Sequence, residues 1–223
     1  MGTATRQQEV LEELRRQIHR IERRPARREG FLASGRPEVD ALLPEGGFPR
    51  GALSALFGGP ASGKTGVALS ALREAQGSGA LAAFVDGRGE LYPPAALALG
   101  VDLARLLIVR PAHGPSRGAR DRDRDRGERN AALPGLWAAE VLLASGAFAA
   151  VAIDVPLHDL PASRAEAMLR RLRAAAEKGG AAALLLAAPG GPAIPAALRL
   201  DLDGARLRPA LRAVGGGEDG RGA

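Results

Sequence analysis

The sequence predicts an α/β fold, with a mostly parallel, twisted sheet flanked by helices. Short apolar runs of strand length recur along the chain, and helical segments separate them. This order is typical of βαβ units in a parallel sheet. The residues GGPASGKT (58–65) form a phosphate-binding loop between an apolar run and a helical segment, which is the context that such a loop requires. An alternating apolar and polar segment at 198–211 predicts an antiparallel hairpin at one edge of the sheet.

The strands are placed by apolar runs bounded by turn residues. These runs predict strands at 52–57, 80–86, 105–110, 148–154 and 181–188. In the C-terminal hairpin, Asp203 and Gly204 are expected to form a two-residue turn, because aspartate followed by glycine favours tight hairpin turns.

Two helices next to these strands have recognisable ends. We expect a helix at 65–76, and Gly77 is placed to end it. The residues SRAE fit a capping box, with Ser163 as N-cap and Glu166 at the third helical position. Two consecutive glycines, Gly179 and Gly180, should stop that helix.

The N-terminal segment, residues 1–30, is predicted to be an amphipathic helix with a linker. A narrow apolar stripe recurs at helical spacing within 6–24, and Pro25 ends the pattern. The stripe consists of Val10, Leu11, Leu14, Ile18 and Ile21. Two interpretations stay open: the helix packs on its own domain, or it docks on a partner or a neighbouring subunit and so supports a homo-oligomer.

The main domain is predicted at 31–213. One segment inside it and one after it have compositions that cannot bury a core. The insert at 114–130, GPSRGARDRDRDRGERN, alternates opposite charges with glycine and proline, which is typical of a flexible solvated loop. A contact with nucleic acid or a partner is the alternative for this insert. Residues 214–223 are predicted to be a disordered tail.

The composition restricts the classes of function. The formal net charge of +6 permits nucleic-acid or acidic-protein partners, although arginine-rich composition also reflects GC-rich codons. The chain has no cysteine, which excludes disulfides and cysteine-based zinc sites. No apolar run approaches membrane-spanning length, and the N-terminus lacks a signal-peptide pattern. We therefore expect a cytoplasmic protein.

The phosphate-binding loop is the strongest functional signal. Its glycines let backbone N–H groups surround phosphate oxygens, and the following helix adds its N-terminal dipole. Lys64 should reach the β- and γ-phosphates, and the Thr65 hydroxyl should coordinate Mg²⁺. The expected nucleotide-binding residues are Gly58, Gly59, Pro60, Ala61, Ser62, Gly63, Lys64 and Thr65. The alternative is a glycine-rich turn that merely precedes a helix.

Asp154 ends the apolar run at 148–154, and an aspartate at the end of such a strand is the expected second magnesium element. Its carboxylate would orient Mg²⁺, usually through water. The alternative is that Asp154 only caps the strand end. ATP and Mg²⁺ are therefore the expected cofactors.

Four stretches carry a family resemblance: ASGRPEVDALLPEGGFPRGALSALFGGPASGKT (33–65), AFVDGRGELYP (83–93), LGVDLARLLIVRP (99–111) and FAAVAID (148–154). Through them the chain resembles the RecA-type recombinase core from about residue 7 to residue 208. The run that precedes the loop, SGxxxxDxLLxxGGxPxG, is much more specific than the loop itself. The resemblance implies a RecA-like P-loop core, ATP bound between subunits, and an N-terminal helix that packs against a neighbour.

The chain departs from that family at the positions that act on ATP. Recombinases carry a glutamate that positions the attacking water, and Arg88 stands at this position; an arginine cannot accept a proton from water. Glu90 is a candidate substitute, and the catalytic residue is otherwise unknown. Ala188 stands near the place of the glutamine that senses the γ-phosphate, and Tyr92 falls where the family contacts adenine. We therefore expect ATP binding with weak or absent hydrolysis.

The segments that bind DNA in recombinases are reduced, since only PGGPAIPAA (189–197) separates two predicted strands. A short RecA-like chain of this kind resembles the ImuA family. That resemblance implies an accessory protein of damage-induced translesion synthesis that binds an ImuB-type polymerase subunit and RecA, with weak or indirect DNA contact. An active DNA-dependent ATPase of the recombinase type is one alternative, and a cell-division inhibitor, for which no motif is visible, is another.

Overall fold

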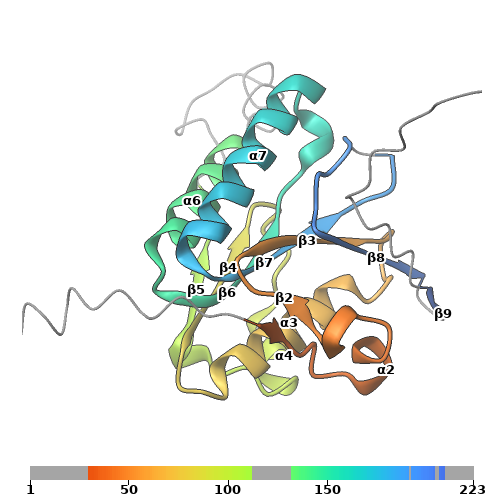
Figure 1. Ribbon diagram of the computed structural model, residues 1–223, viewed down its shortest axis with the longest axis vertical. Coiled ribbons are helices and arrows are strands. Elements are labelled where there is room, and N and C mark those ends of the chain that lie inside the picture. The colour runs from red at the N-terminus through yellow and green to blue at the C-terminus, as the bar shows by residue number, and fades with distance from the viewer. Residues whose placement is uncertain (1–29, 112–131, 191, 204–205, 209–223) are drawn as a thin grey trace, which may run out of the picture.

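The computed structural model describes residues 30–111, 132–190, 192–203 and 206–208, and this part of the chain contains a seven-stranded sheet (Figure 1). The strand order is β5-β4-β6-β7-β3-β8-β9. The first six strands in this order are parallel, and β9 is antiparallel to β8. The strands are β3 (Ala52–Phe57), β4 (Leu81–Asp86), β5 (Leu106–Val109), β6 (Phe148–Asp154), β7 (Ala182–Ala187), β8 (Leu198–Asp203) and β9 (Arg206–Arg208). The α/β fold with a mostly parallel sheet is therefore confirmed.

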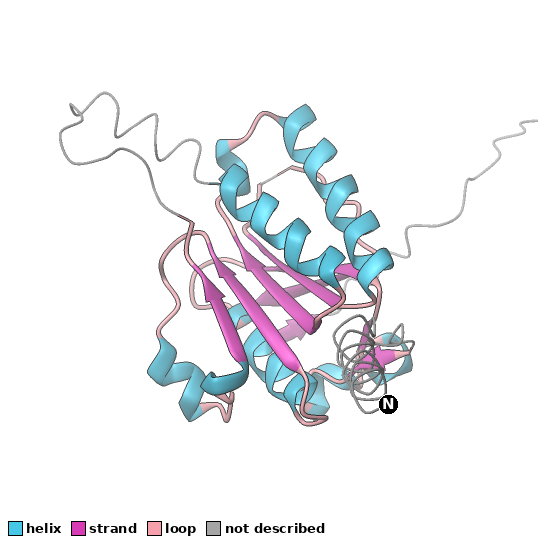
Figure 2. Cartoon of the chain, turned by 90° about the vertical axis from the view of Figure 1, so that its left-hand side faces the viewer, coloured by secondary structure: helices cyan, strands magenta, loops and turns pink. Residues whose placement is uncertain are grey.

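Helices cover both faces of the sheet (Figure 2). Helices α3 (Lys64–Gln76) and α4 (Pro93–Ala98) lie on one face, and α6 (Ala132–Ser145) and α7 (Ala162–Gly179) lie on the other. Successive side chains of a strand point to opposite faces, so Phe84 packs in the core on the α3 side and Val85 in the core on the α6–α7 side. Both cores are buried, which explains why the central strands are apolar along their whole length.

Short elements complete the structure before the first long strand. They are β1 (Phe31–Leu32), α2 (Pro37–Asp40), the 3₁₀ turn η1 (Pro44–Gly46) and β2 (Phe48–Pro49), and two further 3₁₀ turns follow at η2 (Leu103–Arg105) and η3 (Leu157–Asp159). Strands β1 and β2 form a separate antiparallel pair. The periodicity of the sequence did not predict these elements, because two to four residues are too few to show a period.

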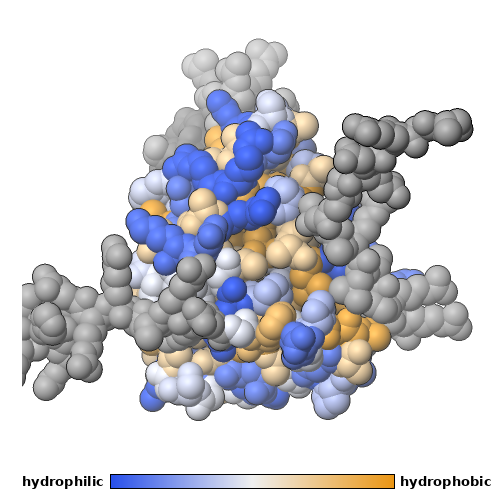
Figure 3. Space-filling view, viewed as in Figure 1, coloured by the Kyte–Doolittle hydropathy of each residue, from blue (hydrophilic) through white to orange (hydrophobic). Residues whose placement is uncertain are grey.

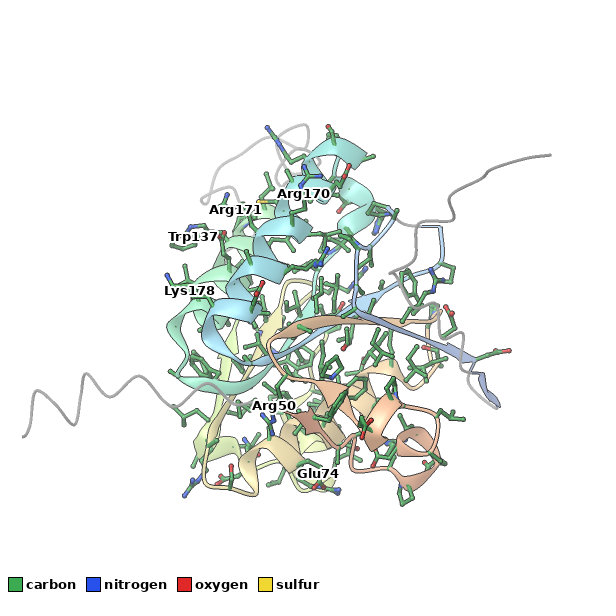
Figure 4. The ribbon with its side chains drawn as sticks, in the orientation of Figure 1. Arg50, Glu74, Trp137, Arg170, Arg171 and Lys178 are labelled. Carbon is green, nitrogen blue, oxygen red and sulfur yellow. The ribbon has the colours of Figure 1, made fainter. Side chains whose placement is uncertain are left out.

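The outer surface of the α6–α7 layer is rich in charged groups, and Figure 3 shows hydrophilic side chains gathered over it. Figure 4 shows that Trp137, Arg170, Arg171 and Lys178 all belong to these two helices. Arg171 of α7 forms an ion pair with Glu140 of α6, with 2.7 Å between nitrogen and oxygen. The two helices also approach closely, because a Cβ atom on Gly179 would lie 1.8 Å from the carbonyl oxygen of Leu143.

Most predicted boundaries agree with the structure to within one residue. The strands at 52–57 and 148–154 have the predicted ends, and the helix predicted from residue 65 begins one residue earlier and ends before Gly77. The glycine stop after the second helix is also confirmed, because Gly180 is its C-cap in the left-handed conformation.

The capping-box prediction was wrong. Helix α7 begins at Ala162, with Pro161 as N-cap and no side-chain cap hydrogen bond. Ser163 therefore lies inside the first turn, where its hydroxyl is not at the N-cap position. Glu166 instead accepts a hydrogen bond from Arg170, one helical turn further along. The proline, with its fixed φ, starts the helix in place of the serine.

The C-terminal hairpin is confirmed, since β8 and β9 pair antiparallel with Asp203 opposite Arg206. The turn predicted at Asp203 and Gly204 was wrong in its position, because Asp203 is the last residue of β8 and pairs with Arg206. Residues 204–205 lie outside the described residues. So do the N-terminal helix predicted at 6–24, the charged insert at 114–130 and the tail at 214–223. No helix among the described residues is long and apolar enough to cross a membrane.

Candidate functional site

The candidate site lies where β3 and β6 end, with β7 between them in the sheet. Parallel strands bring their carboxyl ends to the same edge of the sheet, and ligands of open α/β folds bind there. The loop at 58–63 leaves β3 and leads directly into α3, which begins at Lys64. At the end of β6, Asp154 is paired in register with Asp86 of β4.

The loop after β3 has a tight conformation that its small residues make accessible. Gly63 has a φ of 88° and serves as N-cap of α3, a conformation that glycine adopts without steric cost. A Cβ atom on Gly58 would lie 2.2 Å from the Ser62 hydroxyl oxygen and 2.8 Å from the carbonyl oxygen of Leu202. Glycine is therefore needed at position 58 for close packing and at position 63 for its φ.

Lys64 lies over this loop. Its Nζ atom donates hydrogen bonds to the carbonyl oxygens of Gly58, at 3.1 Å, and Gly59, at 3.0 Å. The ammonium group is thus held at the loop that the sequence predicts to surround phosphate groups. Ser62 is buried, and its hydroxyl has no hydrogen-bond partner among the described residues.

An open pocket of about 340 Å³ connects the loop with the ends of the neighbouring strands. It is lined by Gly58, Gly59, Pro60, Ala61, Lys64, Thr65, Arg88, Glu90, Asp154 and Ala188. The fold thus brings together most of the predicted nucleotide and magnesium residues, together with Arg88, Glu90 and Ala188. Ser62, Gly63 and Tyr92 do not line this pocket. The side chain of Tyr92 is 68% exposed and directly precedes α4.

Asp154 is paired with Arg88 at the far side of the pocket. The Nε atom of Arg88 donates a hydrogen bond of 2.9 Å to the Oδ1 atom of Asp154. Burial nevertheless raises the pKa of the Asp154 carboxyl above its usual value, because removal from water disfavours the charged form. Arg88 and Lys64 act to lower this pKa, and the neighbouring Glu90 acts to raise it.

Asp86 holds the segment that carries Arg88 and Glu90. This carboxylate is fully buried, and it accepts hydrogen bonds from the backbone N–H groups of Glu90, at 3.0 Å, and Leu91, at 3.2 Å. The guanidinium of Arg110 pairs with it at 2.8 Å. Sequence reasoning did not single out Asp86 for this role, although an aspartate followed by glycine at the end of a strand was the available signal.

The pocket has the donor groups that a polyphosphate needs. It combines a glycine-rich loop at the start of the 13-residue helix α3 with the ammonium group of Lys64, and both features favour anions. The residues of the pocket fit Mg²⁺ less well than they fit a polyphosphate. Thr65 lines the pocket, but the Asp154 carboxylate is already paired with Arg88. No group of three or more acidic or histidine side chains that could hold a metal ion occurs in the described part of the chain.

The fold and this loop define an α/β protein of the P-loop class, and comparison with known proteins narrows the class. Residues 15–118 match the model of the RecA N-terminal domain. The chain is 40% identical to Protein RecA of Corynebacterium jeikeium over 123 residues, which are 55% of this chain and 28% of that protein. It is 36% identical to Protein RecA of Staphylococcus carnosus over 129 residues, covering 58% of this chain and 31% of that protein.

A third relative, Protein RecA of Staphylococcus epidermidis, is 38% identical over 128 residues, covering 57% of this chain and 32% of that protein. The match therefore spans about a third of the length of these curated relatives. Together with the six parallel strands and their flanking helices, these similarities support a RecA-like relationship for this chain.

Proposed function

We propose that this chain is a RecA-like ATP-binding accessory protein of the DNA-damage response, with weak or no ATP hydrolysis. The observation that carries the proposal is the composition of the pocket, where Lys64 and the glycine-rich loop face an Arg88–Asp154 ion pair. One side of the pocket favours binding of a polyphosphate. The other side has an arginine where the resemblance places the water-positioning glutamate.

ATP would bind with its phosphates at the loop between β3 and α3, where Lys64 supplies a positive charge. Thr65 would contribute its hydroxyl to a nucleotide-associated Mg²⁺ ion. The predicted adenine contact of Tyr92 also remains part of this proposal. At a nucleotide concentration of 100 times the dissociation constant, binding would stabilise the folded chain by about 2.7 kcal/mol. Bound ATP would thus stabilise the chain in the form that docks on a partner.

Hydrolysis would be slow because the groups that activate water are displaced or missing. Arg88 is always positively charged and cannot act as a general base. Ala188, which also lines the pocket, has no polar group with which to sense the γ-phosphate. Loss of a general base typically reduces a rate by about 10² to 10⁴.

The adaptor part of the proposal rests on the resemblance to the ImuA family. Only ten residues, 188–197, connect β7 to β8, which is short for a loop that threads single-stranded DNA. The proposed role is to connect an ImuB-type polymerase subunit, and RecA itself, during translesion synthesis in the cytoplasm. The predicted N-terminal helix would contact a partner or a second copy of the chain.

One observation favours a second candidate function, a DNA-dependent ATPase that acts in repair. Glu90 lines the pocket beside Arg88, and Asp86 fixes its backbone. A carboxylate at this place is a candidate general base. In that case the chain would be a reduced recombinase with retained catalysis.

Calorimetry with ATP and a turnover assay with and without single-stranded DNA separate the two functions. We expect saturable ATP binding that Lys64→Ala abolishes, and no turnover stimulated by DNA. The matched control is Lys178→Ala, which removes the other lysine of the chain from an exposed position near the end of α7 (Figure 4). DNA-stimulated turnover that is lost in Lys64→Ala would favour the ATPase, and unchanged binding in Lys64→Ala would refute a role for the loop.

A further inference from the structure

The charges around the pocket are balanced by one residue, Arg88. Among the described lining residues, Lys64 and Arg88 are positive, and Glu90 and Asp154 are negative. Without Arg88, the two carboxylates would outweigh the lysine, and a polyphosphate would meet net negative charge. Like charges repel more strongly in a partly buried site than in bulk water. The pocket therefore depends on Arg88, or on a cation that replaces it, to accept phosphate groups.

Arg88 is held in a defined position on the pocket wall. Its Nε atom lies 2.9 Å from Oδ1 of Asp154, and the arginine side chain is 26% exposed, against 9% for the aspartate. The backbone N–H of Gly87 donates to the carbonyl oxygen of Asp154 at 2.7 Å. The buried Asp86 fixes the following residues, Glu90 and Leu91, from the other side. The segment is thus anchored on both sides of Arg88.

The same carboxylate cannot serve Arg88 and a magnesium ion equally well. Mg²⁺ demands near-ideal octahedral geometry, keeps several waters, and usually binds through one or two carboxylates plus substrate phosphates. Asp154 is the predicted carboxylate for this role, and its Oδ1 atom already accepts a charge-assisted hydrogen bond. An ionised carboxylate has lone pairs on both oxygens, so an ion bound through Asp154 would share the carboxylate with Arg88 and be repelled by the positive charge of the guanidinium.

The guanidinium of Arg88 has enough N–H donors to contact both Asp154 and a bound phosphate group. It presents five N–H groups in a planar fork that matches carboxylate and phosphate oxygens. The bond to Asp154 uses the Nε–H group, and the terminal nitrogens provide further donors. Arg88 lines the same pocket as Lys64 and the loop residues. A phosphate held at the loop would thus have a second cationic donor on the opposite wall.

We infer that Arg88 takes the electrostatic place of the divalent cation, so that this pocket binds a nucleoside polyphosphate without requiring Mg²⁺. Asp154 then acts as a positioning residue that orients the guanidinium instead of coordinating a metal ion. This inference rests on the proposed nucleotide binding at the loop. Beyond that function, we infer that Arg88 supplies positive charge that a bound metal ion would otherwise supply.

The test is the dissociation constant of ATP, measured by calorimetry with excess Mg²⁺ and again with EDTA. For the wild-type chain we expect the two values to agree within about threefold, because the counter-charge is part of the protein. In Arg88→Gln, which keeps a polar side chain but removes the charge, EDTA should weaken binding by about tenfold or more, and Mg²⁺ should restore it. The matched control Arg88→Lys keeps a positive charge and should retain binding in EDTA.

A wild-type affinity that falls by about tenfold or more in EDTA would overturn the inference while leaving nucleotide binding intact. The inference would also be overturned if Arg88→Gln bound ATP with the same dissociation constant in Mg²⁺ and in EDTA. The wild-type comparison needs no substitution, so it remains decisive if Arg88→Gln does not fold. Absence of Lys64-dependent binding in both buffers would instead remove the proposed function, and this inference with it.

Discussion

The two walls of the pocket are built by different means. On one wall, the loop at 58–63 and the start of α3 offer backbone groups and Lys64, with few side-chain contacts beyond the loop itself. On the opposite wall, Arg88 pairs with Asp154 across the ends of β4 and β6, and Asp86 pairs with Arg110, which follows β5. The first wall has the chemistry to bind an anion, whereas the Asp154 carboxylate on the second wall is already paired with Arg88.

Under the proposed function, this difference means that the pocket keeps the half that binds phosphate groups while the half expected to hold the metal ion has changed. The conformation of the loop depends on local features, namely small residues and a helix start. The opposite wall depends on contacts between residues far apart in the sequence, and a single arginine changes its charge. Substitutions that affect one wall and spare the other test how independent the two walls are.

The largest effect is expected from Asp86→Ala, which removes the carboxylate that anchors the second wall. This substitution deprives Arg110 and two backbone N–H groups of their buried acceptor. Each buried N–H group left without an acceptor typically costs about 1–3 kcal/mol, whereas the half-exposed Arg110 can be solvated by water. Urea denaturation should therefore show a large loss in the free energy of unfolding.

The matched control for Asp86 is Asp102→Ala. Asp102 is half-exposed, and its carboxylate caps a single 3₁₀ turn through the N–H of Ala104. Loss of such a cap typically costs about 1 kcal/mol. Equal losses of unfolding free energy in the two variants would contradict the anchoring role of Asp86.

An intermediate effect is expected on the first wall, from Gly58→Ala. The new Cβ atom would lie 2.8 Å from the carbonyl oxygen of Leu202, in addition to its contact with Ser62, so the backbone must move. Overpacking of this kind typically costs about 1–3 kcal/mol. We expect a lower thermal midpoint and weaker ATP binding.

Gly59→Ala is the control for this substitution, since a Cβ atom at Gly59 meets no atom within 4 Å. Its unfolding free energy should change by less than about 0.5 kcal/mol, as for surface substitutions away from special features. If Gly59→Ala destabilised the chain as much as Gly58→Ala, the close packing at position 58 would not be the cause.

Sequence patterns predicted the first wall well, because its signals are local. The loop, its apolar strand and the helix start lie within 26 consecutive residues, 52–77, and each has a composition that favours one conformation. Asp154 could also be placed, since an apolar run of seven residues ends on it. Parallel pairing then brings the two strand ends to one edge of the sheet.

The second wall could not be predicted in this way. Arg88 and Asp154 are 66 residues apart in the sequence, and no periodicity links them. The resemblance to recombinases identified Arg88 as a departure, but it did not indicate which group the arginine would contact. Ser163 shows a related limit, because a serine with the right spacing to a glutamate lost the N-cap position to the neighbouring Pro161.

The smallest expected effect concerns the stability contribution of Asp154. Burial raises the pKa of this carboxyl above its ordinary value of 3.8, so the folded chain holds the proton more tightly than the unfolded chain does. Well below pH 3.8 the Asp154 carboxyl is protonated in both the folded and the unfolded chain, so it does not lower the free energy of unfolding. As the pH rises through the raised pKa, ionisation costs more in the folded state, and the free energy of unfolding falls.

Asp154→Asn removes this ionisation and should therefore be more stable, relative to the wild type, at neutral pH than at acidic pH. The partly exposed Arg88 loses its partner in this variant, but water can solvate it, so the cost is small. The measurement is the thermal midpoint of both chains from acidic to neutral pH, with exposed Asp203→Asn as the control substitution. A difference between Asp154→Asn and wild type that shrinks as the pH rises would mean that Arg88, and not burial, dominates the ionisation of Asp154. The second wall would then be a stabilising ion pair, and a magnesium ion would have to overcome a stronger contact to reach the carboxylate.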